Sequence, residues 1–287
     1  MKKKEIKALV SLLDDNDRSI VAQVEEKIIS LGNEVIPYLE NEWENSFNPI
    51  IQKKLEELIH TLQFDQLKFL LIEWKEKGYQ DLLEGMWLIA TYQYPDLKLD
   101  TLRTEVEQMY HEAWRNFRSN IHPYDQIKIL NNVLYSKYKF SANTTNFHSP
   151  ANSMINIVLE TKKGNPITLC VIYLLIAQKL KLPVYGVNLP NLFVCTYKSP
   201  QLQFYINAFN KGLLFSRADL ENYVSNLHIS PLDIFFEPCS NLDIIKRVLR
   251  NLIVSFEKIG DHYKVDEIKI LLNGISFGDD DGTGSYE

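Results

Sequence analysis

The cysteines are the side chains of this sequence that are best suited to covalent chemistry. Cys170, Cys195 and Cys239 each lie among apolar residues. Such surroundings raise the pKa of a thiol and so deplete the reactive thiolate, which favours three inert, structural cysteines. A nucleophilic cysteine that performs acyl transfer would need an imidazole within about 3–4 Å to take its proton. Two histidines are candidates, His148 before the helix that carries Cys170 and His228 after the predicted strands.

The spacing of ligand-type residues argues against a metal or cofactor site. The sequence contains no Cys-x-x-Cys or His-x-x-x-His pair, and its six histidines are dispersed. Its glycines form no phosphate-binding fingerprint. The acidic stretch DDNDRS lacks the spacing and the closing glutamate of an EF-hand loop. We therefore expect neither a metal ion nor a cofactor.

Asparagines with one glutamate are the candidate binding residues. Asn156 and Glu160 are four residues apart in one predicted helix and so share a face. Either they line a groove with asparagines from later segments, or they cap neighbouring elements and satisfy buried backbone groups. Asn188 directly precedes Leu189-Pro190 and favours a turn. The predicted groove residues are Asn152, Asn156, Glu160, Asn188, Asn191 and Asn210.

The elements before these residues are predicted to be helices, from residue 4 to about residue 135. Two short apolar stripes flank the acidic turn Asp14-Asp15-Asn16-Asp17, and such a pair of short helices is similar to a HEAT repeat. Asn48-Pro49 begins a further helix, because proline is favoured at the first helical position. A long amphipathic helix is predicted over residues 99–118.

A polar, turn-rich stretch at residues 136–150 marks a change in the chain. Ser149-Pro150 has the composition of a helix start, with a capping residue followed by proline. Asn165-Pro166 repeats this pattern and begins a strongly apolar helix that runs to about Leu180. These two starts place Asn156, Glu160 and Cys170 on helices.

β-Branched and aromatic residues predict three strands after the apolar helix, over residues 184–189, 193–197 and 203–208. From Pro238 the sequence returns to helical periodicity. An order of helices, then a cluster of strands, then helices predicts an α+β fold. We expect this fold to be mostly helical, with one helix packed on a short antiparallel sheet.

Several short motifs follow one another through residues 146–212. They include Asn152-Ser153, Val158-Leu159-Glu160, Pro166-Ile167-Thr168-Leu169, Leu182-Pro183, Gly186-Val187-Asn188-Leu189-Pro190 and Phe209-Asn210. In this order and spacing they resemble the transglutaminase-like superfamily. More closely they resemble its bacterial SirB-type subgroup, a transglutaminase-like core with tetratricopeptide-like helices. The preceding segment LLEGMWLIATYQYPDLKLDTL is similar to the helical region before that core, so the resemblance covers about residues 80–215.

The resemblance implies three positions for catalysis. Such enzymes carry a cysteine at a helix N-terminus, where the helix dipole favours the thiolate, a histidine on the next strand, and an amide or carboxylate on the following strand. The corresponding positions hold Thr168, at the end of a window that begins at Pro166, then Leu192 and Asn207. Leucine cannot transfer a proton, and loss of a general base costs about 10²- to 10⁴-fold in rate. The resemblance therefore implies a degenerate catalytic site.

With this resemblance, the sequence divides into five predicted regions. They are a HEAT-like helical region at 1–78, a helical lead-in at 79–136, a transglutaminase-like core at 137–237, C-terminal helices at 238–275 and a disordered acidic tail at 276–287.

These observations lead to one functional hypothesis and two alternatives. The leading hypothesis is a catalytically degenerate transglutaminase-like protein that binds a peptide or protein, or acts as a scaffold. The first alternative is an active hydrolase or amide-exchanging enzyme, with Cys170 as a displaced nucleophile and His148 as its base. It requires an exposed Cys170 beside an imidazole. The second alternative is an adaptor made of helical repeats.

Composition bounds the location and the partners. The formal net charge of −6 argues against non-specific binding to nucleic acid. No run of about 18 apolar residues occurs, so we expect no membrane span. The basic start MKKKE leads into a polar helix, which differs from a secretion signal. Three scattered cysteines suit a reducing cytoplasm. We therefore expect a cytoplasmic protein with a protein or peptide partner.

Overall fold

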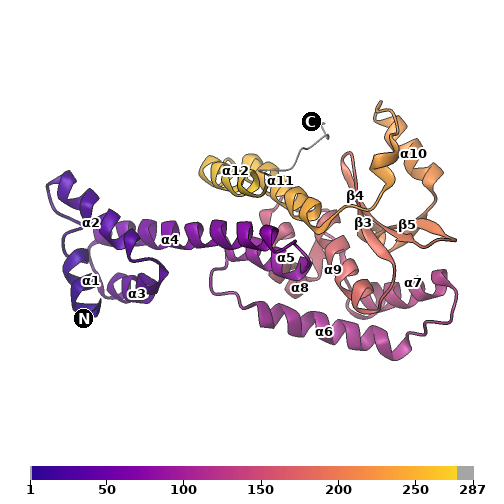
Figure 1. Ribbon diagram of the computed structural model, residues 1–287, viewed down its shortest axis with the longest axis horizontal. Helices are drawn as coiled ribbons and strands as arrows, with labels where there is room; N and C mark the ends of the chain where they lie inside the picture. The colour runs from indigo at the N-terminus through magenta and orange to yellow at the C-terminus, as the bar shows by residue number, and fades with distance from the viewer. Residues whose placement is uncertain (1, 277–287) are drawn as a thin grey trace. The chain divides into compact units, whose positions relative to one another are not determined.

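The chain divides into two compact units, Met1–Leu70 and Leu71–Glu287. The computed structural model describes residues 2–276 (Figure 1). The boundary between the units falls within helix α4 (Pro49–Glu76). All but the first residue of the predicted acidic tail lies outside the described residues, and the finer division into five regions stays a prediction.

The first unit consists of short helices around a small apolar core. Its elements are α1 (Lys2–Val10), α2 (Arg18–Ser30), α3 (Ile36–Asn45) and the first part of α4. Asp17, the last residue of the acidic turn, caps α2 because its side chain accepts a hydrogen bond from the N–H of Ser19. Ile6, Leu13 and Leu39 are among the buried residues of the core. The helices predicted on either side of the acidic turn are therefore present.

The second unit carries a four-stranded antiparallel sheet. Its order is β3-β4-β5-β6, with bounds Val184–Leu189, Leu192–Lys198, Gln203–Asn207 and Leu213–Phe215. A two-residue turn, Pro190-Asn191, joins β3 to β4, and Asn191 takes the left-handed conformation with φ +56° that asparagine tolerates well. The sequence predicted the first three strands and missed β6, which has three residues.

Helices surround this sheet, so the mostly helical α+β fold is confirmed (Figure 1). The predicted start at Ser149-Pro150 forms only a short 3-10 turn, Pro150–Ser153, before α8. Residues 141–142 and 163–164 pair as the short parallel strands β1 and β2. Asn132–Lys137 forms a π-helical segment, which is a rare conformation. The α-helices are α5 (Leu82–Thr91), α6 (Leu99–Asn116), α7 (Pro123–Asn131), α8 (Ile155–Thr161), α9 (Pro166–Lys179), α10 (Arg217–Asn226), α11 (Asn241–Ile259) and α12 (His262–Ser276).

Helix α9 is the centre of the second unit. Every residue from Ile167 to Ala177 is buried, so the helix is covered on all sides. One side packs on β3 and β4, and α5, α6 and α11 contact the helix elsewhere. The opposite face of the sheet packs on α10 and the 3-10 turn Asp233–Phe236 through an apolar cluster that includes Val187, Tyr205 and Leu220.

Helices α11 and α12 form a C-terminal hairpin. Ser240 caps α11 in a capping box with Asp243, and Gly260 ends the helix in the left-handed conformation. Among the helices of residues 2–276, none is long and apolar enough to cross a membrane.

Candidate functional site

The N-terminus of α9 is the position to which the resemblance assigns a nucleophile. Asn165 caps the helix, and its Oδ1 accepts a hydrogen bond of 2.9 Å from the N–H of Thr168. Its Nδ2 donates to Oγ of Ser153 at 2.9 Å. Thr168 is fully buried, and its Oγ1 has no hydrogen-bond partner among the described residues. The asparagine cap therefore occupies an N–H group that would otherwise stabilise an anion there.

Leu192 lies on the face of the sheet that points away from α9. It packs against the apolar cluster beside α10, together with Val187 and Val194. Cys195, three residues later, faces α9, and its Sγ donates to the carbonyl of Cys170 at 3.8 Å. Since side chains alternate along a strand, a side chain at residue 192 points toward α10. The structure thus places Leu192 and Thr168 on different sides of the sheet.

Asn207, the third position implied by the resemblance, has a local structural contact. It lies at the end of β5, and its Oδ1 accepts a hydrogen bond of 3.1 Å from the N–H of Asn210. This contact caps the following 3-10 turn, Ala208–Asn210. The side chain of Asn210 is itself exposed.

The three thiols are free and are surrounded by protein. Cys170 and Cys195 are fully buried, and Cys239 is mostly buried. Burial, a hydrogen bond with Cys170 and the neighbouring thiols hold the pKa of Cys195 well above its ordinary range. Burial and the nearby Asp243 carboxylate raise the pKa of Cys239 to about 12. Each of these shifts depletes the thiolate near neutral pH.

The alternative of an active enzyme with Cys170 as nucleophile requires that this thiol is exposed beside an imidazole. The described residues do not show that arrangement. Cys170 is 0% exposed, and its Sγ donates to the carbonyl of Phe193 at 3.6 Å. His148 is exposed and lies edge-on to the ring of Phe147, with centroids 5.2 Å apart. His228 is also exposed.

Asn152, one of the predicted groove residues, fixes the loop before α8. Its Oδ1 accepts from Nδ2 of Asn143 at 2.8 Å. Its Nδ2 donates to the carbonyl oxygens of Asn146 and Phe147, at 2.7 and 3.0 Å. Asn152 is almost completely buried, so this network satisfies backbone groups of the loop.

The other predicted groove residues are dispersed over the second unit. Asn156 is half-buried and its Oδ1 has no hydrogen-bond partner in the described chain, whereas Glu160 is exposed. Asn188 accepts a hydrogen bond of 3.3 Å from Nη1 of Arg247, a half-buried residue of α11. Burial and the nearby Arg250 lower the pKa of Arg247. Asn191 is exposed in the turn between β3 and β4.

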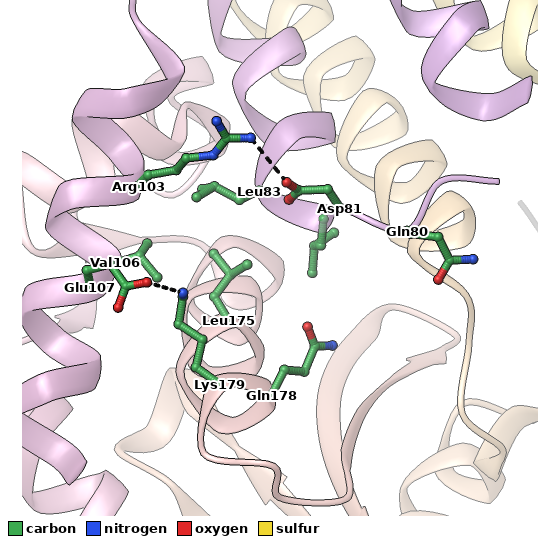
Figure 2. Close-up of a pocket in the computed structure, with 10 residues that line it drawn as sticks. Gln80, Asp81, Leu83, Arg103, Val106, Glu107, Leu175, Gln178 and Lys179 are labelled. Carbon is green, nitrogen blue, oxygen red and sulfur yellow. Dashed lines mark hydrogen bonds and ion pairs between the residues drawn. The ribbon is translucent and has the colours of Figure 1, made fainter. Parts of the chain in front are cut away.

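A cleft of about 500 Å³ opens on another side of α9 (Figure 2). Three segments line it, at the N-terminus of α5, in the first half of α6 and at the C-terminal end of α9. The lining residues are Gln80, Asp81, Leu82, Leu83, Arg103, Val106, Glu107, Leu175, Gln178 and Lys179. None of the predicted groove residues is among them, so sequence reasoning missed this site.

Two ion pairs cross the cleft from α6 (Figure 2). Nη2 of Arg103 lies 3.6 Å from Oδ2 of Asp81, and Glu107 pairs with Lys179. Arg103 also contacts the exposed Asp100, at 3.3 Å. The two pairs tie α6 to α5 and to α9, and each places one positive and one negative charge at the rim.

The floor of the cleft is apolar and its rim is polar. Leu83, Val106 and Leu175 are buried between the two ion pairs. Gln178 is exposed near the C-terminal end of α9. An apolar floor with a few convergent polar groups is the usual composition of a ligand site.

Comparison with known proteins decides the family. Residues 100–250 match the family model described as the transglutaminase-like superfamily. The chain belongs to this superfamily. Its matched region runs from α6 to the middle of α11 and therefore contains α9, the sheet and most of the cleft.

Two relatives illustrate the range of proteins that the chain matches. A protein named UPF0162 protein from Xylella fastidiosa (strain 9a5c) is 30% identical over 179 residues, which is 60% of this chain and 63% of the relative. F-box only protein 21 of Homo sapiens is 24% identical over 224 residues, which is 68% of this chain and 35% of the relative. The chain thus spans less than two thirds of the length of these relatives. No solved structure matches the chain significantly. The SirB-type subgroup and the loss of catalysis stay predictions.

Proposed function

We propose that this transglutaminase-like protein is a non-catalytic module that binds a peptide or protein segment. One observation carries the proposal: where the family chemistry needs a thiol and a facing imidazole, the chain has a buried Thr168 and a Leu192 directed to the other face of the sheet. Without nucleophile and base, acyl transfer has no obvious route.

The cysteines support the same proposal. Cys170 is buried, and the pKa values of Cys195 and Cys239 are raised by burial. A catalytic thiol needs the opposite surroundings, with a lowered pKa and access for substrate. The three free thiols also support our inference that the protein works in a reducing compartment such as the cytoplasm.

Thiol reactivity tests this proposal. The native protein is treated with iodoacetamide at about pH 6 and about pH 8 and followed by intact mass, beside the single variants Cys170→Ser, Cys195→Ser and Cys239→Ser. We expect slow labelling that rises with pH, or labelling only after unfolding. One cysteine that reacts quickly at pH 6 would identify a stabilised thiolate, and the non-catalytic proposal would then be wrong.

A further inference from the structure

We propose that the cleft between α5, α6 and α9 binds an extended peptide segment whose aliphatic side chain is next to a basic residue. The inference rests on the proposed binding function and names the ligand class and its site. It concerns a surface separate from the residues Thr168, Leu192 and Asn207.

The cleft can hold one aliphatic side chain of a peptide between its two ion pairs, Arg103–Asp81 and Glu107–Lys179. Arg103 and Glu107 are four residues apart on α6, which separates them by about 6 Å along the helix axis. Val106 lies between them and forms the floor with Leu83 and Leu175 (Figure 2). A volume of about 500 Å³ is within the range of ligand sites, and it leaves room for the peptide backbone beside the anchored side chain.

Two glutamines offer hydrogen bonds to that backbone. The side chain of Gln178 makes no hydrogen bond within the described part of the chain, although it is exposed at the rim. Gln80 uses its Nε2 to donate to the carbonyl of Gly78 at 3.0 Å, which leaves its Oε1 as an acceptor. An amide side chain both donates and accepts, so the pair can match the alternating N–H and C=O groups of an extended peptide.

The charges around the cleft favour a peptide in which a basic residue is next to the aliphatic residue that enters the cleft. Asp81, Asp100 and Glu107 supply three negative charges, whereas Arg103 and Lys179 supply two positive charges. Arg103 divides its contacts between two carboxylates, and the side chain of Asp100 is 91% exposed. The charged residues that line the cleft balance, and the extra negative charge comes from Asp100, which lies outside the lining and shares Arg103 with Asp81. The end of the cleft near Asp81 is therefore where a lysine or arginine of the ligand would find its partner.

The experiment uses the full chain with methyl-labelled leucine and valine and follows its NMR spectrum. The probe is acetyl-Ala-Lys-Leu-Ala-amide, with the Lys→Glu and Leu→Ser peptides as comparisons. We expect shifts of the methyl groups of Leu83, Val106 and Leu175. The glutamate peptide should bind about two- to fivefold more weakly, and the serine peptide at least about tenfold more weakly.

Asp81→Asn is the matched variant of the protein. Asp81 caps α5 by accepting a hydrogen bond from the N–H of Glu84, and asparagine is as good a cap, so the fold is retained. We expect this variant to lose the preference for lysine over glutamate in the peptide. Asp125→Asn removes the same charge from an exposed ion pair with Lys128 on α7 and should leave that preference unchanged.

The outcomes separate this inference from the proposed function. Peptide-induced shifts confined to methyl groups of Leu189, Leu192 and Val194 would show that the peptide binds at the sheet. The proposal of a binding site in the cleft would then be wrong, while the non-catalytic proposal would stand. Absence of any shift at millimolar peptide would also show that the cleft does not bind such a peptide. A rapidly labelled thiol would reject the non-catalytic proposal, whereas shifts at Leu83, Val106 and Leu175 would still locate the peptide in the cleft.

Discussion

Leu192 and Cys195 lie on the same strand and face opposite sides of the sheet. Leu192 packs toward α10, and the thiol of Cys195 donates to the carbonyl of Cys170 in α9. The two residues are three positions apart, and because side chains alternate along a β-strand, an odd separation places them on opposite faces. A proton-transferring residue at position 192 would therefore be separated from the N-terminus of α9 by the strand itself.

Introducing the cysteine and the histidine that the resemblance assigns to positions 168 and 192 should not produce a reactive thiol. In the double variant Thr168→Cys and Leu192→His, the imidazole enters the apolar cluster beside α10. We expect slow alkylation of Cys at position 168 at pH 6, equal to that of Thr168→Cys alone. Leu192→His should also lower the free energy of unfolding by about 1–3 kcal/mol, because it places a polar ring among apolar side chains at a half-buried position. Faster labelling in the double variant would contradict the placement of Leu192.

Asn152→Ala should destabilise the second unit. The substitution removes the contacts with Asn143, Asn146 and Phe147, so the carbonyl of Phe147 and the side-chain amide of Asn143 lose their hydrogen bonds to the buried Asn152. We expect a loss of about 2–4 kcal/mol in the free energy of unfolding, measured in urea by tryptophan fluorescence. Asn210→Ala is the control, because that side chain is exposed and the change should cost less than about 0.5 kcal/mol. Equal effects of the two substitutions would argue against the loop-fixing role.

Gly212→Ala and Gly260→Ala compare two glycines with nearly the same backbone. Their φ angles are +74° and +78°, so both substitutions force alanine into the left-handed backbone conformation. This conformation lowers the free energy of unfolding by about 1 kcal/mol in each variant. At Gly212 the new methyl group would also overlap the side-chain amide of Asn131, whereas at Gly260 nothing lies within 4 Å.

Asn131 cannot easily move, because it donates to the carbonyl of Gly212 at 3.1 Å and accepts from the hydroxyl of Tyr173 at 3.0 Å. We therefore expect Gly212→Ala to lower the free energy of unfolding by at least about 3 kcal/mol. Thermal unfolding of the two variants checks this difference, and similar melting temperatures would show that Asn131 gives way.

Acid should weaken the capping box at the start of α10. Hydrogen bonds from the hydroxyl and the backbone N–H of Ser216 lower the pKa of Asp219. A carboxyl whose pKa is lowered by folding stabilises the folded state above its unfolded pKa, about 3.9, and loses that contribution as the pH falls toward the lowered value. We expect Asp219→Asn to unfold with a smaller dependence on pH below about 4 than the wild type. Asp125→Asn is the control; if both variants changed the pH dependence equally, the capping box would not be its cause.

The sequence predicts the elements around the candidate site better than it predicts their contacts. Asn165-Pro166 identifies the start of α9 because capping and proline preference are local properties. The strands at 184–189 and 203–207 follow from residue composition in the same way. Residues 132–137 form a π-helical segment that no pattern in the sequence predicted.

The cleft could not be derived from the sequence, because three segments far apart in the chain build it. Gln80 to Leu83, Arg103 to Glu107 and Leu175 to Lys179 come together only when α5 and α6 pack on α9. Periodicity shows that α6 has an apolar face but not which helix covers it. The face of Leu192 was similarly hidden, since alternation gives the relation between Leu192 and Cys195 but not the side on which α9 lies.

Burial of α9 on all sides has a consequence for the newly made chain. Its buried residues from Ile167 to Ala177, nearly all apolar, are translated after α5 and α6 but before β3, β4 and α11, which cover the rest of the helix. At roughly 5–20 residues per second, the helix waits several seconds for α11 to be synthesised. During that interval a nascent chain exposes an apolar surface that no finished molecule presents, and that surface would be open to chaperones and to aggregation.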